Sequence, residues 1–175
     1  VTTFQKTIGF GGETPNGVLI VDAQTGDIER YSMENAPAWA DMIQPQQIVH
    51  DMLKTWGTYV HGWFNGSMFG AQRDVIRPGD DMVIIQGTDG RTHYMTDFTS
   101  AHGGVEGAMS AIVAVDTRTR EVIEYRISGA TPTRACSAIE NAEGVRANAY
   151  TCAGTYAASV GGVESYCIPL QGSDG

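Results

Sequence analysis

The chain has 175 residues and carries 20 acidic against 11 basic side chains, a formal net charge of −9. A surface of this sign repels a phosphate backbone, so the composition argues against a nucleic-acid partner. The chain is 42% hydrophobic, but it has no apolar run near the roughly 20 residues that a membrane-spanning helix needs. We therefore expect a globular protein and no membrane contact by this segment itself.

The first predicted elements are a strand around Val1–Thr7 and a β-hairpin over Val18–Met33. Asp22 opens the hairpin turn, because its side chain can accept hydrogen bonds from backbone N–H groups, and Gly26 suits a left-handed position late in the turn. The chain begins at Val1 without a signal peptide. We therefore expect it to be a processed product or a piece of a larger protein.

A helix is predicted from Pro37 to about Phe64, broken by Pro45. Apolar residues recur in it at intervals of three and four, and this stripe should face a sheet: Val49, Met52, Leu53, Trp56, Val60 and Trp63.

A second hairpin is predicted over Met82–Phe98, where Asp89-Gly90 is a strong turn signal. We interpret Asp97 as closing this hairpin, and the pair Asp80-Asp81 as turn and solvated residues that precede it.

The next segment, Ile112–Ile127, aligns without gaps on Val18–Met33 at an offset of 94 residues. Four positions are identical: Val21, Asp22, Thr25 and Tyr31 match Val115, Asp116, Thr119 and Tyr125. We interpret this as an internal repeat. Because Arg120 replaces Gly26, we expect the second turn to differ. The first copy also lacks a counterpart of the strand at Met82–Gln86, which we expect to lie upstream of Val1 in a parent protein.

A shorter helix is predicted from about Pro132 to Asn141, and two strands between Val145 and Leu170 around Gly161-Gly162. Three cysteines, an odd number, are too few for a disulfide scaffold. Buried thiols and a single bridge both remain possible for them: Cys136, Cys152 and Cys167.

The turn Val21–Ile28 and its copy Val115–Val122 resemble the hairpin of PepSY-type domains, which are small non-catalytic α+β modules of extracytoplasmic proteins and peptidase propeptides. Several further blocks look like parts of large, often membrane-anchored bacterial and phage proteins of unknown function: Ile8–Gly12, Trp56–Asn65, Ile127–Thr131 and Ala142–Gly144. The resemblance implies no activity and no functional residues.

No motif indicates catalysis or a cofactor. His50 and His61 share a helix face, but their axial separation of roughly 16 Å is too long for one metal ion. The sequence has no Gly-x-Ser-x-Gly elbow and no phosphate-binding glycine loop. The segment His102–Gly107 suggests an oxyanion loop, yet its repeat-mate carries Ile8 at the histidine position, so a structural turn explains it better.

The candidate site lies at the aromatic end of the predicted helix and on the glycine-rich loop. These residues could pack in the core, form an interface or line a pocket: Trp56, Tyr59, His61, Trp63 and His102.

The sequence therefore predicts an α+β protein of two tandem units, 1–76 and 77–175, in one compact body, with the long helix packed on antiparallel hairpins and the shorter helix in the second unit. We expect a non-catalytic interaction or assembly module of a larger extracytoplasmic or virion protein, with itself or its parent assembly as partner. The alternatives are a ligand-binding or enzymatic domain with a pocket at the aromatic helix end, and a peptidase-inhibiting module like a propeptide.

Overall fold

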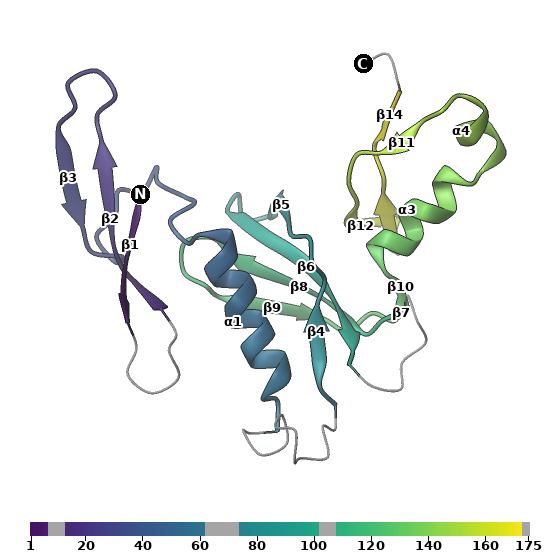
Figure 1. The fold of residues 1–175 in the computed structure, drawn as a ribbon, viewed down its shortest axis with the longest axis horizontal. Helices are drawn as coiled ribbons and strands as arrows, with labels where there is room; N and C mark the ends of the chain where they lie inside the picture. Colours follow the sequence, from purple (N-terminus) through teal and green to yellow (C-terminus); the bar gives the residue numbers. More distant parts are fainter. Residues whose placement is uncertain (7–12, 62–73, 102–107, 173–175) are drawn as a thin grey trace.

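The protein is an α+β structure of mostly antiparallel strands and a few short helices. A computed structural model describes residues 1–6, 13–61, 74–101 and 108–172. Its parts follow one another along the long axis: a small sheet from the N-terminal residues, a larger sheet with a helix on it, and a C-terminal group of short elements (Figure 1). No helix of these residues has the length and hydrophobicity to cross a membrane.

The N-terminal sheet has the order β1-β2-β3, from Thr2–Lys6, Glu13–Val21 and Ile28–Tyr31. One of its faces is covered by the chain that follows it, because Val18 is buried together with Ala36 and Ile43. The predicted first strand and first hairpin are therefore present.

Residues 37–44 are not helical, so the predicted start of the long helix at Pro37 was wrong. The helix α1 covers Gln46–Thr58, with Pro45 as an extended N-cap. A proline disfavours helical geometry at the residue before it, which explains why the helix does not extend back past Pro45. It also ends before the predicted Phe64: Tyr59 is the C-cap, and residues 62–64 lie outside the described chain.

The larger sheet contains five antiparallel strands in the order β4-β6-β8-β9, with β5 also pairing with β6. Their bounds are β4 (Ile76–Pro78), β5 (Val83–Gln86), β6 (Thr92–Ser100), β8 (Ala111–Asp116) and β9 (Val122–Tyr125). The hairpins predicted around Asp89-Gly90 and at Ile112–Ile127 are both part of it.

Helix α1 covers one face of this sheet. Val49 and Leu53 are buried against a group of sheet residues that includes Phe98 and Val113. Gly57 makes the close approach possible, because a Cβ there would collide with the carbonyl oxygen of Ile76 in β4.

The opposite face is covered by the hairpin of β12 (Tyr156–Val160) and β13 (Val163–Cys167). Ala157 and Tyr166 pack against Met95, Met109 and Ile112. Because both faces are covered, every residue of β8 is buried. Such a strand reads as a continuous apolar run, as Ala111–Val115 does.

Short elements complete the C-terminal part: β7 (Ala108–Met109) pairs with β10 (Gly129–Ala130), and β11 (Thr151–Cys152) pairs with β14 (Leu170–Gln171). Helix α3 (Pro132–Glu140) agrees with prediction, whereas the region expected to begin a strand at Val145 lies in helix α4 (Glu143–Ala147). A disulfide joins Cys136 of α3 to Cys152 of β11, and Cys167 is a half-buried free thiol.

One side chain ties the linker 36–44 to the large sheet. The Arg118 guanidinium donates hydrogen bonds to the carbonyl oxygens of Pro37 and Ala40, each at 2.9 Å, and to that of Ala36. Nearby, the backbone N–H of Gln44 donates to the carbonyl of Thr117 at 2.9 Å.

We predict that Arg118→Ala destabilises the fold by about 2–3 kcal/mol, because three linker carbonyls lose a charged donor. The measurement is the free energy of unfolding in urea, followed by circular dichroism. Gln24→Ala is the matched control, since Gln24 occupies the equivalent turn position 94 residues earlier and is exposed. Equal losses in the two variants would contradict the role of Arg118.

Candidate functional site

The predicted aromatic site lies at the exposed end of α1. Trp56 is 42% exposed and meets Phe98 edge-on, with ring centroids 5.6 Å apart. Tyr59 is exposed as well, and the Nε2 atom of His61 lies 2.9 Å from an oxygen of Asp74. Trp63 and His102 fall outside the described residues, so the complete set stays a prediction.

Two features elsewhere have more developed geometry: the pair of matched hairpins, and a large cavity on the far side of the sheet from α1. Neither that cavity nor a second, smaller one is lined by Trp56, Tyr59 or His61. Within the described chain, no group of three or more His, Cys, Asp or Glu side chains could hold a metal ion.

The matched hairpins β2-β3 and β8-β9 pair their residues in the same register. Val18 lies opposite Tyr31, and Ile112 opposite Tyr125, each position being shifted by 94. The next three pairs along each ladder follow the same shift.

The two turns are also built alike. The Oδ1 atom of Asp22 accepts the backbone N–H groups of Gln24 and Thr25 at 2.7 and 3.0 Å. In the second turn, the Oδ1 atom of Asp116 accepts the backbone N–H groups of Arg118 and Thr119, the equivalent residues, at 2.8 and 2.7 Å. Each aspartate therefore orders its turn by bonding backbone donors, as the sequence indicated.

The expected difference between the turns was wrong. Arg120 adopts a φ of 65°, close to the 79° of Gly26, and its backbone N–H bonds the carbonyl of Asp116 as that of Gly26 bonds Asp22. A left-handed arginine is strained. We attribute the tolerance of this strain to two backbone hydrogen bonds that close the turn: the N–H of Arg120 donates to the carbonyl of Asp116, and the N–H of Asp116 donates to that of Glu121.

The environments of the two turn aspartates differ. Asp22 is exposed, whereas Asp116 is 1% exposed and lies 2.9 Å from a guanidinium nitrogen of Arg91. Burial raises the pKa of Asp116, but hydrogen bonds from Thr119 and Arg118 and the charge of Arg91 outweigh it, so that the net pKa lies below its ordinary value. The pKa of Asp22 is lowered by the backbone bonds from Thr25 and Gln24.

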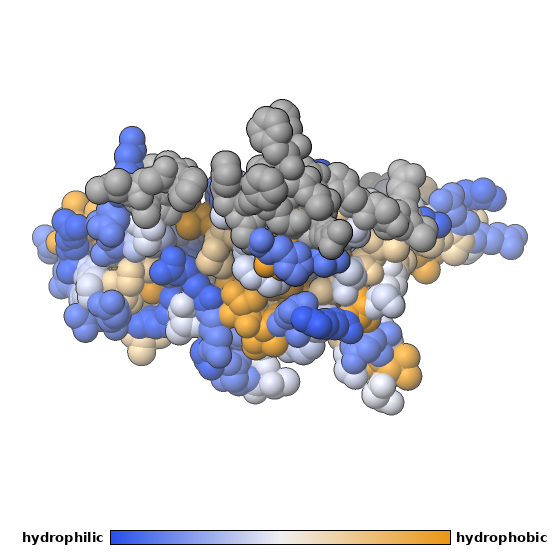
Figure 2. Space-filling model, turned by 90° about the horizontal axis from the view of Figure 1, so that it is seen from below, coloured by the Kyte–Doolittle hydropathy of each residue, from blue (hydrophilic) through white to orange (hydrophobic). Residues whose placement is uncertain are grey.

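Strands β3 and β9 form outer edges of their sheets in the described structure. All four residues of β9 are exposed, including the apolar Val122, Ile123 and Tyr125. In a view from below, apolar residues reach the surface near the middle of the molecule among hydrophilic ones (Figure 2).

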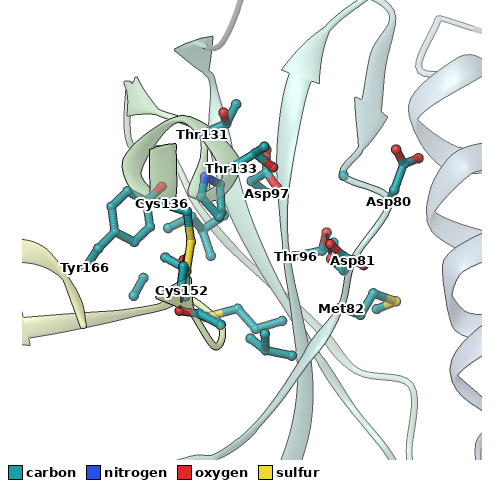
Figure 3. Close-up of a pocket in the computed structure, with 18 of the residues that line it drawn as sticks. Asp80, Asp81, Met82, Thr96, Asp97, Thr131, Thr133, Cys136, Cys152 and Tyr166 are labelled. Carbon is teal, nitrogen blue, oxygen red and sulfur yellow. Dashed lines mark hydrogen bonds between the residues drawn. A yellow bond between two sulfur atoms is a disulfide. The ribbon is translucent and has the colours of Figure 1, made fainter. Parts of the chain in front are cut away.

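The larger cavity, of about 930 Å³, lies between the large sheet and the C-terminal part. In Figure 3, Asp97 of β6 stands on the side of that strand where Cys136 and Tyr166 lie. The interpretation of Asp97 as a hairpin-closing turn residue was wrong, because it pairs with Ile112 in the middle of the sheet and is 8% exposed.

The sequence contained one signal for this position: an acidic residue within the run from His93 to Phe98, where alternate residues face opposite sides of a strand. Reading the strand as far as Ser100, instead of ending it at Phe98, places Asp97 in its interior.

We predict that Asp116→Asn lowers the free energy of unfolding at pH 7 by about 1–3 kcal/mol, through loss of the ion pair and weaker backbone bonds. The pKa of Asp116 in the folded chain lies below the value of about 3.9 in the unfolded chain. Its contribution to stability is therefore full above pH 4 and is lost as the pH falls through the pKa of the folded state. Urea unfolding between pH 7 and pH 2.5 measures it. Asp22→Asn, at the exposed equivalent position, should lower the free energy of unfolding by less. If the difference in stability between the parent and Asp116→Asn does not narrow in acid, the ionised carboxylate is not its origin.

Comparison of the chain with protein-family models, with curated proteins and with solved structures found no match. Its function therefore has to follow from the geometry and chemistry of the residues themselves.

Proposed function

We propose that this chain is a non-catalytic interaction module that associates with another protein chain by strand addition at the open edge of β9. The observation that carries the proposal is the combination of an open edge with apolar side chains at the surface along the same short strand. Edge strands of this kind template pairing with a further strand unless they are blocked or covered.

The register identifies which backbone groups are available. The N–H of Asp116 bonds the carbonyl of Glu121, and in an antiparallel ladder hydrogen-bonded and non-hydrogen-bonded pairs alternate. The pairs Val115–Val122 and Val113–Glu124 are therefore the non-hydrogen-bonded ones. The N–H and C=O groups of Val122 and Glu124 consequently point away from β8, toward the open edge.

The side chains along this edge favour association as well. Val122, Ile123 and Tyr125 are each at least 40% exposed. Cross-strand pairs of β-branched and aromatic residues stabilise a ladder by about 0.2–1 kcal/mol each. A second copy of the chain offers the same edge, and a two-fold axis would pair the two edges with themselves.

The disulfide supports the wider setting of the proposal. Bridges persist mainly in oxidising compartments and at virion or cell surfaces, which fits a module of a larger extracytoplasmic or virion protein. Cys136–Cys152 is such a bridge. Intact mass with and without reduction tests it in material from the natural source, where two free thiols at these positions would oppose this setting.

We predict that the chain self-associates and that Glu124→Pro abolishes the association while the fold is retained. Proline at this position removes an outward N–H and leaves the bonds to β8 intact, which edge strands tolerate. Sedimentation over a range of concentrations measures the association, and amide exchange should show that the N–H groups of Val122 and Glu124 are protected only in the associated form.

Ile123→Pro is the matched control, because its N–H faces β8 and its loss should destabilise the hairpin itself. A chain that stays monomeric at every concentration, or a Glu124→Pro variant that associates as before, would refute strand addition by a second copy. A monomer that hydrolyses a substrate would refute the non-catalytic reading altogether.

We further infer that the two hairpins arose by tandem duplication of one unit. The shared register, the matching aspartate turns and the shared left-handed position support this. The neighbouring strands are paired in the same way but with the offset changed by one residue: Thr3 of β1 lies opposite Gly17, and Phe98 of β6, 95 residues later, lies opposite Ala111. The arrangement β1-β2-β3 thus repeats β6-β8-β9, and α1 then follows the first hairpin as α3 follows the second.

The duplication predicts equivalent cross-strand contacts in solution. Non-hydrogen-bonded antiparallel pairs bring their Cα atoms to about 4.5 Å, which gives strong Hα–Hα nuclear Overhauser effects. We expect such signals for Leu19–Arg30 and for Val113–Glu124, which are related by the offset of 94. A register in either hairpin that breaks this offset would contradict the inference.

A further inference from the structure

The larger cavity has one wall from the sheet and one from the C-terminal part. Gly79, Asp97 and Ile112 line it from the first wall. The disulfide Cys136–Cys152 and Tyr166 line it from the second, and Figure 3 shows them on the side of β6 where Asp97 stands. Its volume of about 930 Å³ lies at the upper end of the roughly 300–1,000 Å³ that is typical of sites for organic ligands.

Asp97 is the unusual residue in this cavity. It is 8% exposed, and no hydrogen bond or ion pair from another described residue reaches its carboxylate. An oxygen of this carboxylate lies so close to the Cα of Gly79 that a Cβ there would collide with it. A buried carboxylate without a charge partner is costly, which is why such groups are normally paired.

The groups around Asp97 make a positively charged partner more favourable. Burial is the main cause that raises the pKa of Asp97, and the charge of Asp80 adds to it. Asp81 and, from α3, Glu140 also line the cavity, and among its described lining residues there is no lysine, arginine or histidine. Tyr166 of β13 faces the same space, and its pKa is raised to about 12 by burial and by Asp97.

Three other polar side chains of the cavity already have partners. Glu140 accepts the backbone N–H of Cys152 at 2.8 Å, and Tyr166 donates to the carbonyl of Ala130 at 2.8 Å. The hydroxyl of Thr96 donates to the carbonyl of Asp81 at 3.0 Å. Asp80 and Asp81 line the cavity too but are exposed, so Asp97 is the buried acceptor that a ligand inside the cavity would meet.

We propose that this cavity binds a small organic amine, whose ammonium group pairs with the carboxylate of Asp97. An organic cation fits better than a metal ion, because no cluster of three potential metal ligands exists among the described residues. Met95, Ile112 and Ala157 line the same space and offer apolar contact to the carbon chain of the amine. The site is separate from the β9 edge and does not depend on self-association.

The test is titration of the chain with 1,4-diaminobutane, followed calorimetrically and by amide chemical shifts, with 1,4-butanediol as the uncharged probe of similar shape. We expect saturable binding of the diamine only, with shifts at Gly79 and Thr96. Asp97→Asn should weaken it by about 10- to 100-fold, as expected for loss of a charged hydrogen bond.

Glu34→Gln is the matched control, because it removes the same charge from an exposed acid outside the cavity. Unchanged binding in this variant separates the site from general attraction to the acidic chain. The proposal is overturned if the diamine does not bind saturably, if the diol binds as well, or if the two variants weaken binding equally.

A second readout distinguishes loss of the site from loss of the fold. A raised folded pKa means that ionised Asp97 costs stability above that pKa, and the cost disappears as the pH falls through it. Without ligand, Asp97→Asn should therefore melt at a higher temperature than the parent at pH 7, with a gap that shrinks toward pH 4. At the same concentration, diamine should raise the melting temperature of the parent by more than that of the variant, because the variant binds it more weakly. A variant that melts lower than the parent at pH 7 without ligand would overturn the assignment.

Discussion

The position of the linker between the two hairpins depends on one turn, and much of the remaining structure depends on that linker. Arg118 bonds three of its carbonyl groups, and the hydroxyl of Thr117 donates to the carbonyl of Asp41 at 3.0 Å. Helix α1 begins two residues after Gln44, whose carbonyl accepts the hydroxyl of the buried Tyr94 at 3.1 Å. The turn thus sets where α1 meets the sheet and where the N-terminal sheet attaches.

The two hairpins show how one backbone design can serve two purposes. Both use an aspartate to bond the following backbone N–H groups, and both close with a left-handed residue. The residues of the first turn are exposed to solvent. The second carries Thr117 and Arg118 where the first has Ala23 and Gln24, and these two side chains convert a solvent-exposed turn into a contact with the linker.

Local patterns predicted the parts whose structure is decided locally. Alternation and turn residues were sufficient for the hairpins at Val18–Met33, Met82–Phe98 and Ile112–Ile127, and the proline at Pro132 was sufficient for the start of α3. The linker could not be predicted in this way. Pro45 indicates where α1 begins, but the carbonyls of Pro37 and Ala40 accept hydrogen bonds from Arg118, about 80 residues away. No residue near the linker therefore indicates the path that it takes.

The cavity and the identity of the two bridged cysteines could not be predicted, for the same reason. Asp97 sits in an ordinary strand sequence, and its burial follows from the C-terminal hairpin that packs over it. The pairing of Cys136 with Cys152, and not with Cys167, depends on how α3 lies against β11. The bridge has no local sequence signature, and the only local sign for Asp97 was an acidic residue within the alternating strand from His93 to Phe98. The aromatic cluster at the end of α1 had a clear signature, yet only Trp56, Tyr59 and His61 of that cluster lie in the described chain.

The central strand β8 has a consequence for how the two hairpins can vary in sequence. Val113 and Val115 are fully buried beneath α1, and Ile112 and Ala114 are buried on the face toward the C-terminal hairpin. A polar side chain at any of these four positions would therefore be shielded from water. Its counterpart β2 keeps one open face, where Val21 is exposed. The first hairpin should therefore tolerate polar substitutions at more positions than the second.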